Sequence, residues 1–257
     1  MEAKKGESLA ACLAELHLPT MRGEYEAVER QAAAETWGYG EYLLELARRE
    51  CAQRRQNRIE RLLRSSKLPL EKSWSSLELK RLPPKAAQQL RGLLSGDFLD
   101  RRQNVLVFGP PGSGKTHALA AVAQELVRSG RRLLFATTSL LVQELLAAKR
   151  DLALKGLLKR LSWWEGLVLD DLGYVQQSRE EMEVLFTLLS ERYERGSVLL
   201  TSNLPFSKWE QIFKDPMTTA AAIDRLVHHS VIVEMNVSSY RAEAAKRTRG
   251  TPTPKPE

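Results

Sequence analysis

The stretch that constrains this chain most is an apolar run, a glycine-rich loop and an amphipathic helix, all within residues 104–126. Residues 104–108 are predicted to form a buried strand, and the helix after the loop carries Leu119, Val122 and Leu126 on one face. The loop between them matches the pattern GxxxxGK[ST]. Its residues are Gly109, Pro110, Pro111, Gly112, Ser113, Gly114, Lys115 and Thr116. A glycine-rich turn that binds nothing would not need this full pattern between a strand and a helix, so the stretch predicts a phosphate-binding loop.

The residue types in this loop suit the phosphates of a nucleotide. Backbone N–H groups of the loop and of the first helical turn converge on a phosphate, and a side chain at Gly112 or Gly114 would block that approach. Lys115 is expected to place its charge on the β- and γ-phosphates, and the Thr116 hydroxyl is expected to bind Mg²⁺. His117 follows directly and is included among the nucleotide-binding residues. The predicted ligands are therefore ATP and Mg²⁺.

A second motif, LVLDDLG at residues 167–173, is an apolar strand that ends in carboxylates. In a sheet centre such a strand ends beside the phosphate loop, where Asp170 is expected to hold Mg²⁺ directly or through water. Asp171 is placed to orient or deprotonate the attacking water, which makes it a predicted catalytic residue together with Lys115. Two acids at a strand end can also cap a helix, but the preceding phosphate loop favours the metal interpretation. Asn203 ends the next predicted strand and can reach the γ-phosphate, although an asparagine there is often a turn residue.

Strands and helices alternate from residue 104 onward, which predicts an α/β fold with a parallel sheet covered on both faces. The chain before this part has a helical pattern, and a connector rich in serine and proline separates the two. The final residues are basic and rich in Pro and Thr, a composition typical of disorder. The expected parts are a small all-α N-terminal domain at 1–68, a linker at 69–85, a nucleotide-binding domain at 86–245 and a disordered tail at 246–257.

Positive charge is unevenly distributed along the chain. The formal net charge is +7, and eight Lys or Arg against two Glu give a net charge of +6 between Arg48 and Lys67 alone. Three of these arginines share one helix face at spacing i, i+4, i+7. A charged solvated face is one interpretation, and a phosphate-facing helix of a DNA-binding module is the interpretation that we favour. The candidate DNA contacts in this segment are Arg54, Arg55, Arg58 and Arg61.

Arg225 lies in a predicted helix just before the last strand. It either pairs with Asp224 or Asp215 at the surface, or reaches the γ-phosphate of a neighbouring subunit as an arginine finger. The residues alone leave these two interpretations even.

The cysteines and the hydropathy pattern bear on location. Cys12 and Cys51 lack metal-ligand spacing, which is typical of a cytosolic protein with reduced thiols. No signal-peptide pattern opens the sequence, and no apolar run approaches the length of a membrane span. We therefore expect a cytoplasmic protein with no membrane partner.

Several stretches together resemble the IstB family, the ATP-binding helper proteins of bacterial insertion-sequence transposition. They cover most of residues 8–242 and read LHLPTMRGEYE, AAAETWGYGEYLLELARRE, RRQNRIERLLR, NVLVFGPPGSGKTHALAA, LVLDDLG, LLTSNLPFSKWEQIF, AAAIDRLVHHSVIVEM and SYR. This family is close to the DnaC helicase loaders within the AAA+ superfamily. The resemblance implies an AAA+ P-loop NTPase fold with a five-stranded parallel sheet of order 5-1-4-3-2. It also implies nucleotides at subunit boundaries, and hence a homo-oligomer.

For single residues, the resemblance implies that Asn203 senses the γ-phosphate, that Arg225 is the arginine finger and that Arg241 is a second phosphate sensor. Resemblance to initiator-type AAA+ proteins suggests that the helical stretch 139–161, expected to break near Gly156, faces DNA inside the assembly, with a solvated face as the equal alternative. The candidate DNA contacts there are Lys149, Arg150, Lys155 and Lys159. Because the chain after the fifth strand is short, no full C-terminal lid is expected.

The function that these features imply is DNA-stimulated ATP hydrolysis by an oligomer on double-stranded DNA, bound largely without sequence preference, which stimulates a partner transposase. A DnaC-like helicase loader is the alternative, because the motor is shared. The stretch TWGYGEYLLELARRE favours the transposition family. A metabolic P-loop kinase needs an acceptor pocket and a lid, and the sequence indicates neither.

Overall fold

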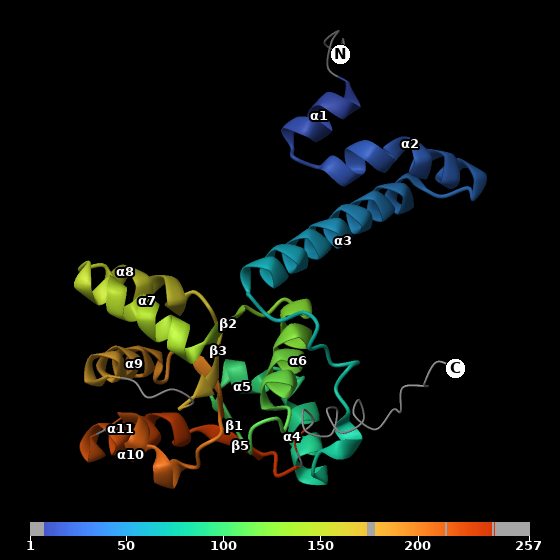
Figure 1. The fold of residues 1–257 in the computed structure, drawn as a ribbon. Coiled ribbons are helices and arrows are strands. Elements are labelled where there is room, and N and C mark those ends of the chain that lie inside the picture. Colours follow the sequence, from blue (N-terminus) through green and yellow to red (C-terminus); the bar gives the residue numbers. More distant parts are fainter. Residues whose placement is uncertain (1–7, 174–177, 214, 238, 240–257) are drawn as a thin grey trace, which may run out of the picture. The chain divides into compact units, whose positions relative to one another are not determined.

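The polypeptide forms two compact units, and the division between them falls between Arg61 and Leu62. The computed structural model describes residues 8–173, 178–213, 215–237 and 239. The first unit is helical throughout its described part, and the strands that the structure describes all belong to the second unit (Figure 1).

The first unit consists of α1 (Leu9–Glu15), α2 (Pro19–Ala34) and most of α3 (Tyr39–Ser65). Ser8 caps α1 by accepting a hydrogen bond from the backbone N–H of Ala11. Proline occupies the first turn of α2, where its missing N–H leaves no bond unmade. The expectation of a helical N-terminal region is met, while the predicted domain limits stay predictions.

A buried carboxylate holds α2 against α3. Glu50 on α3 accepts hydrogen bonds from the backbone N–H groups of Thr20 (2.8 Å) and Met21 (3.1 Å) at the start of α2. Arg54 donates to Glu50 (2.7 Å) and also to the backbone carbonyl of His17. Burial opposes the ionised form, but the hydrogen bonds from Arg54, Met21 and Thr20 outweigh it and lower the pKa of Glu50.

The second unit is built on a five-stranded parallel sheet in the order β2-β3-β4-β1-β5. This is the order 5-1-4-3-2 read from the other edge, so the predicted topology is confirmed. The strands are β1 (Asn104–Phe108), β2 (Leu133–Thr137), β3 (Gly166–Leu172), β4 (Ser197–Ser202) and β5 (Ser230–Glu234).

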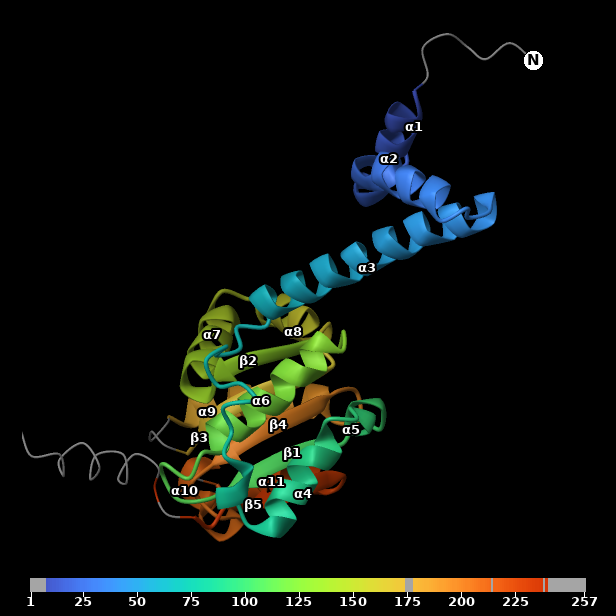
Figure 2. The same cartoon turned by 90° about the vertical axis from the view of Figure 1, so that its right-hand side faces the viewer.

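Helices cover both faces of this sheet, as Figures 1 and 2 show. On β1, Val105 and Val107 pack in one apolar cluster and Leu106 packs in the other, as the period-two geometry of a strand requires. The first cluster includes residues of α4 (Pro84–Leu93), α5 (Asp97–Asp100) and α6 (Lys115–Arg128). The second includes residues of α7 (Thr138–Arg150), α8 (Leu154–Ser162), α9 (Arg179–Arg192), α10 (Glu210–Phe213) and α11 (Pro216–Val227). Two short 3₁₀ helices are η1 (Leu79–Arg81) and η2 (Phe206–Lys208).

The predicted helical stretch 139–161 is interrupted at a different place from the one expected. The chain leaves the helix at residues 151–153, where Leu152 has a positive φ of 57°, while Gly156 lies inside α8. A helical glycine costs only about 1 kcal/mol relative to alanine, so an exposed one does not force a break.

Residues 235–237 and 239 follow β5 without helix or strand. The prediction that no full lid is present concerns the chain after β5, and the remainder of that segment lies outside the described residues. The predicted tail at 246–257 lies outside them as well.

Candidate nucleotide-binding site

The glycine-rich loop joins β1 to α6 in the arrangement that the sequence predicts. Gly112 and Gly114 have φ values of +78° and +91°, which side-chain-bearing residues rarely adopt. At Gly109 the constraint is space, because an added Cβ would lie 2.5 Å from the backbone oxygen of Met235. Helix α6 begins at Lys115, so the unpaired N–H groups of its first turn lie next to this loop. The result is a backbone cradle suited to an anion.

Lys115 is held within the loop. Its side chain is buried, and Nζ donates to the carbonyl oxygens of Gly109 (2.8 Å) and Pro110 (3.0 Å). The Ser113 hydroxyl is also buried, and within the described part of the chain it has no hydrogen-bond partner. A buried cation and an unsatisfied hydroxyl in one cradle fit a phosphate group.

The two predicted magnesium ligands are brought together. Asp170, near the end of β3, accepts a hydrogen bond from the Thr201 hydroxyl of β4 (2.6 Å) and another from the side chain of Thr116. Burial raises the pKa of Asp170, and the hydrogen bonds from Thr201 and Thr116 only partly offset it. The hydroxyl of Thr116 and the carboxylate of Asp170 form an oxygen donor pair, which is the ligand chemistry that Mg²⁺ prefers. These residues therefore fit the predicted ion.

Asp171 and Asn203 face the same cavity. The register between β3 and β4 shifts between Leu169 and Leu172, and Asp171 there has a φ of +60°. Its backbone N–H donates to Thr201 Oγ1 (2.8 Å), and its side chain is exposed. A cavity of about 440 Å³ is lined by Asp171 and Asn203 together with the loop residues 111–117. The strand ends thus deliver the predicted catalytic groups to the predicted phosphate cradle.

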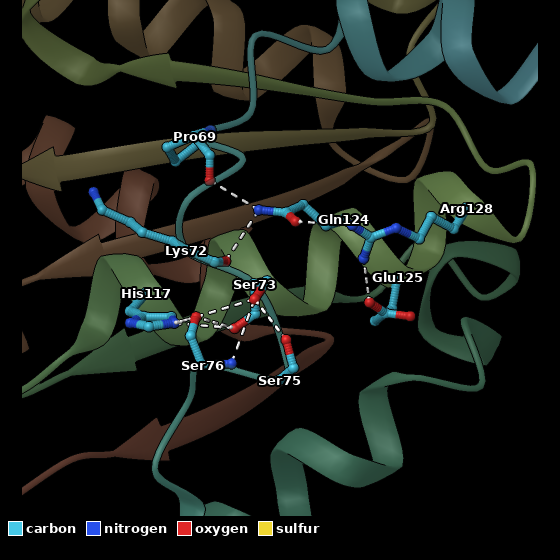
Figure 3. A network of polar contacts seen from close by, with 9 residues as sticks. All are labelled: Pro69, Lys72, Ser73, Ser75, Ser76, His117, Gln124, Glu125 and Arg128. Atoms are coloured by element: carbon cyan, nitrogen blue, oxygen red, sulfur yellow. Dashed lines mark hydrogen bonds and ion pairs between the residues drawn. The ribbon is translucent and has the colours of Figure 1, made fainter.

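A segment that the sequence indicated only as a connector also lines this cavity. Residues 69–78, here called the strap, run beside α6, and Lys72 and Glu78 contribute to the cavity wall. The buried amide of Gln124 donates to the carbonyls of Pro69 (2.8 Å) and Lys72 (3.0 Å), as Figure 3 shows. His117 Nε2 lies 3.0 Å from the carbonyl oxygen of Ser73. In the sequence, a polar glutamine on the buried face of the predicted helix was the one sign that another segment of the chain binds there.

Arg225 does not join this group. It lies near the end of α11, where its guanidinium carbon sits 4.8 Å above the ring centroid of Phe186 and Nη1 donates to the carbonyl of Ala221 (2.9 Å). Its own carbonyl accepts from the Asn104 side chain at the start of β1, whereas the glycine loop follows the end of that strand. The predicted sensor Arg241 lies outside the described residues.

The predicted DNA-contacting side chains differ in whether they already form hydrogen bonds within the protein. Arg54 is tied to Glu50 and to the His17 carbonyl, so it has a structural task within the first unit. Arg61 donates to the carbonyl of Asn57 (3.2 Å). The side chains of Arg54, Arg55, Arg58 and Arg61 are all exposed.

In the second unit, the basic residues of α7 and α8 are also exposed. Lys149 pairs with Glu183 (2.9 Å), and Arg150 lies 3.9 Å from Glu180. Lys155 and Lys159 lie on α8. Exposed ion pairs contribute about 0–1 kcal/mol, so they leave these cations available to another anion.

A phosphate-binding loop after the first strand, carboxylates at the end of the third and a 5-1-4-3-2 parallel sheet define an ATP-binding protein of the AAA+ fold. Among the described residues, no helix is both long and apolar enough to cross a membrane. The chain belongs to the family of IstB-like ATP binding proteins, whose family model matches residues 11–248.

Similar proteins agree with this assignment. The chain is 43% identical over 95% of its length to "Putative insertion sequence ATP-binding protein y4iQ/y4nD/y4sD" of Sinorhizobium fredii, covering 83% of that protein. It is 34% identical over 93% of its length to a Pseudomonas aeruginosa protein named for insertion sequence IS21, covering 90% of it.

Solved structures resemble the chain in fold. The DnaI structure has a TM-score of 0.55 at 22% identity, with 64% of this chain and 90% of that chain covered. The DnaA structure from Aquifex aeolicus has a TM-score of 0.56 at 16% identity, with 71% and 55% covered. At these identities the likeness shows the fold alone.

Proposed function

We propose that this protein is a DNA-stimulated ATPase that assembles on double-stranded DNA and stimulates a partner transposase of its insertion sequence. The observation that carries the proposal is that Lys115, Thr116, Asp171 and Asn203 line one cavity, while Asp170 is hydrogen-bonded to Thr116. Family membership and the insertion-sequence relatives support the context of transposition. The cytoplasm, where DNA and ATP are both present in a bacterium, is the proposed location.

In the proposed reaction, Lys115 leaves the loop carbonyls and binds the β- and γ-phosphates of ATP. Thr116 and Asp170 would hold Mg²⁺, which would supply positive charge to the phosphates. Asp171 orients the attacking water and accepts its proton, and Asn203 donates a hydrogen bond to the γ-phosphate or to the water. Asp171 lies in the bulge of β3, and its exposed carboxylate faces the cavity in which this task is proposed.

Arg225 is proposed to complete the site of a neighbouring copy. The carbonyl of Arg225 is bound by Asn104, the first residue of β1, and the glycine loop begins after Phe108. Four residue steps along a strand span about 13 Å, which is longer than an arginine side chain. Within one chain Arg225 is thus remote from the phosphates, which favours a role in trans and an assembly that depends on ATP.

The basic surfaces support the DNA part of the proposal. Arg55, Arg58 and Arg61 on α3, and Lys155 and Lys159 on α8, are exposed cations suited to phosphate contacts. The alternative function, loading of a replicative helicase, has a likeness in fold to the DnaC helicase loader in its favour, but sequence similarity to insertion-sequence proteins extends over almost the whole chain.

The decisive biochemical test is ATP hydrolysis by wild type and by Asp171→Asn, each with and without duplex DNA. Asparagine tolerates the left-handed backbone of position 171, so the variant changes the carboxylate and not the fold. We expect unchanged ATP binding, loss of hydrolysis by roughly 10²–10⁴-fold, and stimulation of wild type by DNA. Equal hydrolysis by both proteins would remove Asp171 from the reaction, and a lack of stimulation would refute the coupling to DNA.

The role in transposition is tested in cells that carry a marked copy of the insertion sequence with its own transposase. We expect insertion to require wild-type protein and to drop with Asp171→Asn. Normal insertion without this protein, together with a replication defect, would favour the helicase-loader alternative.

A further inference from the structure

The strap is held against α6 at two points. Gln124, which is fully buried, donates to the carbonyls of Pro69 and Lys72, and His117 contacts the Ser73 carbonyl and the Ser76 hydroxyl (3.1 Å). The hydroxyls of Ser73 and Ser76 also lie within hydrogen-bond distance of each other (3.0 Å), which closes the strap into a turn (Figure 3). The backbone of Lys72 is therefore fixed relative to the helix that begins with Lys115.

From this fixed backbone the Lys72 side chain enters the wall of the nucleotide cavity. In Figure 3 it extends away from Gln124, toward the side where the arrowheads mark the carboxyl ends of the strands. Lys72 is half-buried, and no carboxylate among the described residues pairs with its ammonium group. The ammonium group is close enough to Asp170 for their opposite charges to attract each other.

The proposed reaction does not yet assign an anionic partner to the ammonium group of Lys72. In that reaction Lys115 serves the β- and γ-phosphates from the loop side, and Thr116 and Asp170 would hold the magnesium ion. Lys72 lines the same cavity from the strap. An ammonium group that is partly removed from water is stabilised by an anion, and a terminal phosphate carries the densest negative charge of a nucleoside triphosphate.

We propose that Lys72 binds the γ-phosphate of ATP in cis and that the strap thereby distinguishes the triphosphate from the diphosphate. This inference rests on the proposed nucleotide-binding function. Before hydrolysis, the γ-phosphate links Lys72 to the cradle and fixes the strap. After release of phosphate that link is gone, and the strap keeps its hydrogen bonds with Gln124 and His117 and the packing of Trp74 and Leu77 against the apolar core. The strap is therefore a sensor of the nucleotide state.

The test compares binding of β,γ-methylene ATP and of ADP, both with Mg²⁺, to wild type and to Lys72→Gln by calorimetry. A charged hydrogen bond corresponds to about a ten- to hundred-fold change in affinity, so the triphosphate analogue should bind Lys72→Gln that much more weakly. ADP affinity should change less than about threefold, because ADP lacks the group that Lys72 contacts. Lys72→Arg should retain most of the preference for the triphosphate.

Lys80→Gln is the matched control. Lys80 is exposed on η1 and is not among the described residues that line the cavity. Its replacement by glutamine removes the same charge as Lys72→Gln. It should leave both affinities unchanged. If Lys72→Gln weakens the binding of both nucleotides equally, Lys72 attracts nucleotides by its charge without distinguishing the γ-phosphate. If both affinities are unchanged, Lys72 is solvated. Either result overturns the proposal.

A second readout follows the strap itself. Backbone hydrogen exchange in residues 69–78 should be slower with β,γ-methylene ATP than with ADP in wild type, and this difference should vanish in Lys72→Gln. Failure of wild type to bind either nucleotide would refute the proposed function as a whole. Normal binding with no difference in exchange would refute only the sensor role.

Discussion

Asn104 offers a sharp test of how the second unit is held together. Its side-chain amide donates to the carbonyls of Arg225 (3.2 Å) and Leu226 (3.0 Å), and its Oδ1 accepts from the N–H of Val198 (2.9 Å). One buried side chain thus ties the start of β1 to the end of α11 and to β4. Asn104→Asp keeps the size and the acceptor, but turns the donor into an oxygen that faces two carbonyls.

The expected cost follows from that inversion. An uncompensated buried charge costs about 3–5 kcal/mol, which is the destabilisation expected at pH 8. Protonation restores one donor, so that the cost in acid falls to about 1 kcal/mol, the value of a single lost hydrogen bond. The ionised form is therefore penalised by about 3 kcal/mol more than the protonated form, which raises the folded pKa of the introduced carboxyl above its ordinary value. Because the folded pKa is raised, stability is recovered as the pH falls through it.

The assay is urea unfolding at pH 8 and pH 5, followed by tryptophan fluorescence. Trp74, Trp163, Trp164 and Trp209 are in the second unit, so the signal reports mainly on it. Asn236→Asp is the control, since Asn236 is exposed in the same unit and its substitution should cost less than about 0.5 kcal/mol at both pH values. A cost for Asn104→Asp that is equal at both pH values, or below 1 kcal/mol at pH 8, would refute the reasoning.

Three further results are expected. Arg225→Ala and Lys115→Ala should each lack ATPase activity, while their mixture recovers part of it; a mixture that co-assembles but stays inactive contradicts a finger in trans. Glu50→Gln should lower the stability of α1–α3 by about 1–3 kcal/mol at neutral pH, measured by hydrogen exchange. Because the folded pKa of Glu50 is lowered, this difference should shrink as the pH falls below about 4.5, and a constant difference would contradict it. Burial lowers the pKa of Arg192 to about 10, and its guanidinium donates to four backbone carbonyls at 2.7–3.2 Å, so Arg192→Met should cost about 3–5 kcal/mol in urea unfolding; a cost below 1 kcal/mol would be inconsistent with that network.

The sequence predicts the parts of the site that are consecutive in the chain. The loop at 109–116 and the acids after the third strand follow from local patterns, because each motif is one strand end and its neighbour. Their meeting follows from the sheet, since parallel strands deliver their carboxyl ends to one edge. The strand order itself came from the family resemblance and not from periodicity.

Contacts between distant residues account for what the sequence did not predict. The strap lies in a stretch rich in serine and proline, which indicates a connector, yet Gln124 and His117 bind its carbonyls from 44 to 55 residues away. Arg54 has the spacing of a solvated or DNA-facing residue, but besides Glu50 it also binds a carbonyl 37 residues earlier. Local sequence patterns indicate hydrophobic periodicity and turns. They do not indicate which backbone carbonyl a side chain distant in the sequence will bind.

Strand β1 connects the two halves of the proposed shared site. Its carboxyl end continues into the loop that carries Lys115, and its first residue, Asn104, binds the carbonyl of Arg225. Residues 105–107 between these ends are completely buried and paired on both sides, with β4 and with β5. Such a strand does not bend without breaking its ladders, so the distance from the loop to the Arg225 backbone is constant. If Arg225 of each copy binds the nucleotide of the next copy, a rigid β1 fixes the distance between the two nucleotide sites that one copy contacts. The spacing of successive copies then depends on the length of this strand and of one arginine side chain.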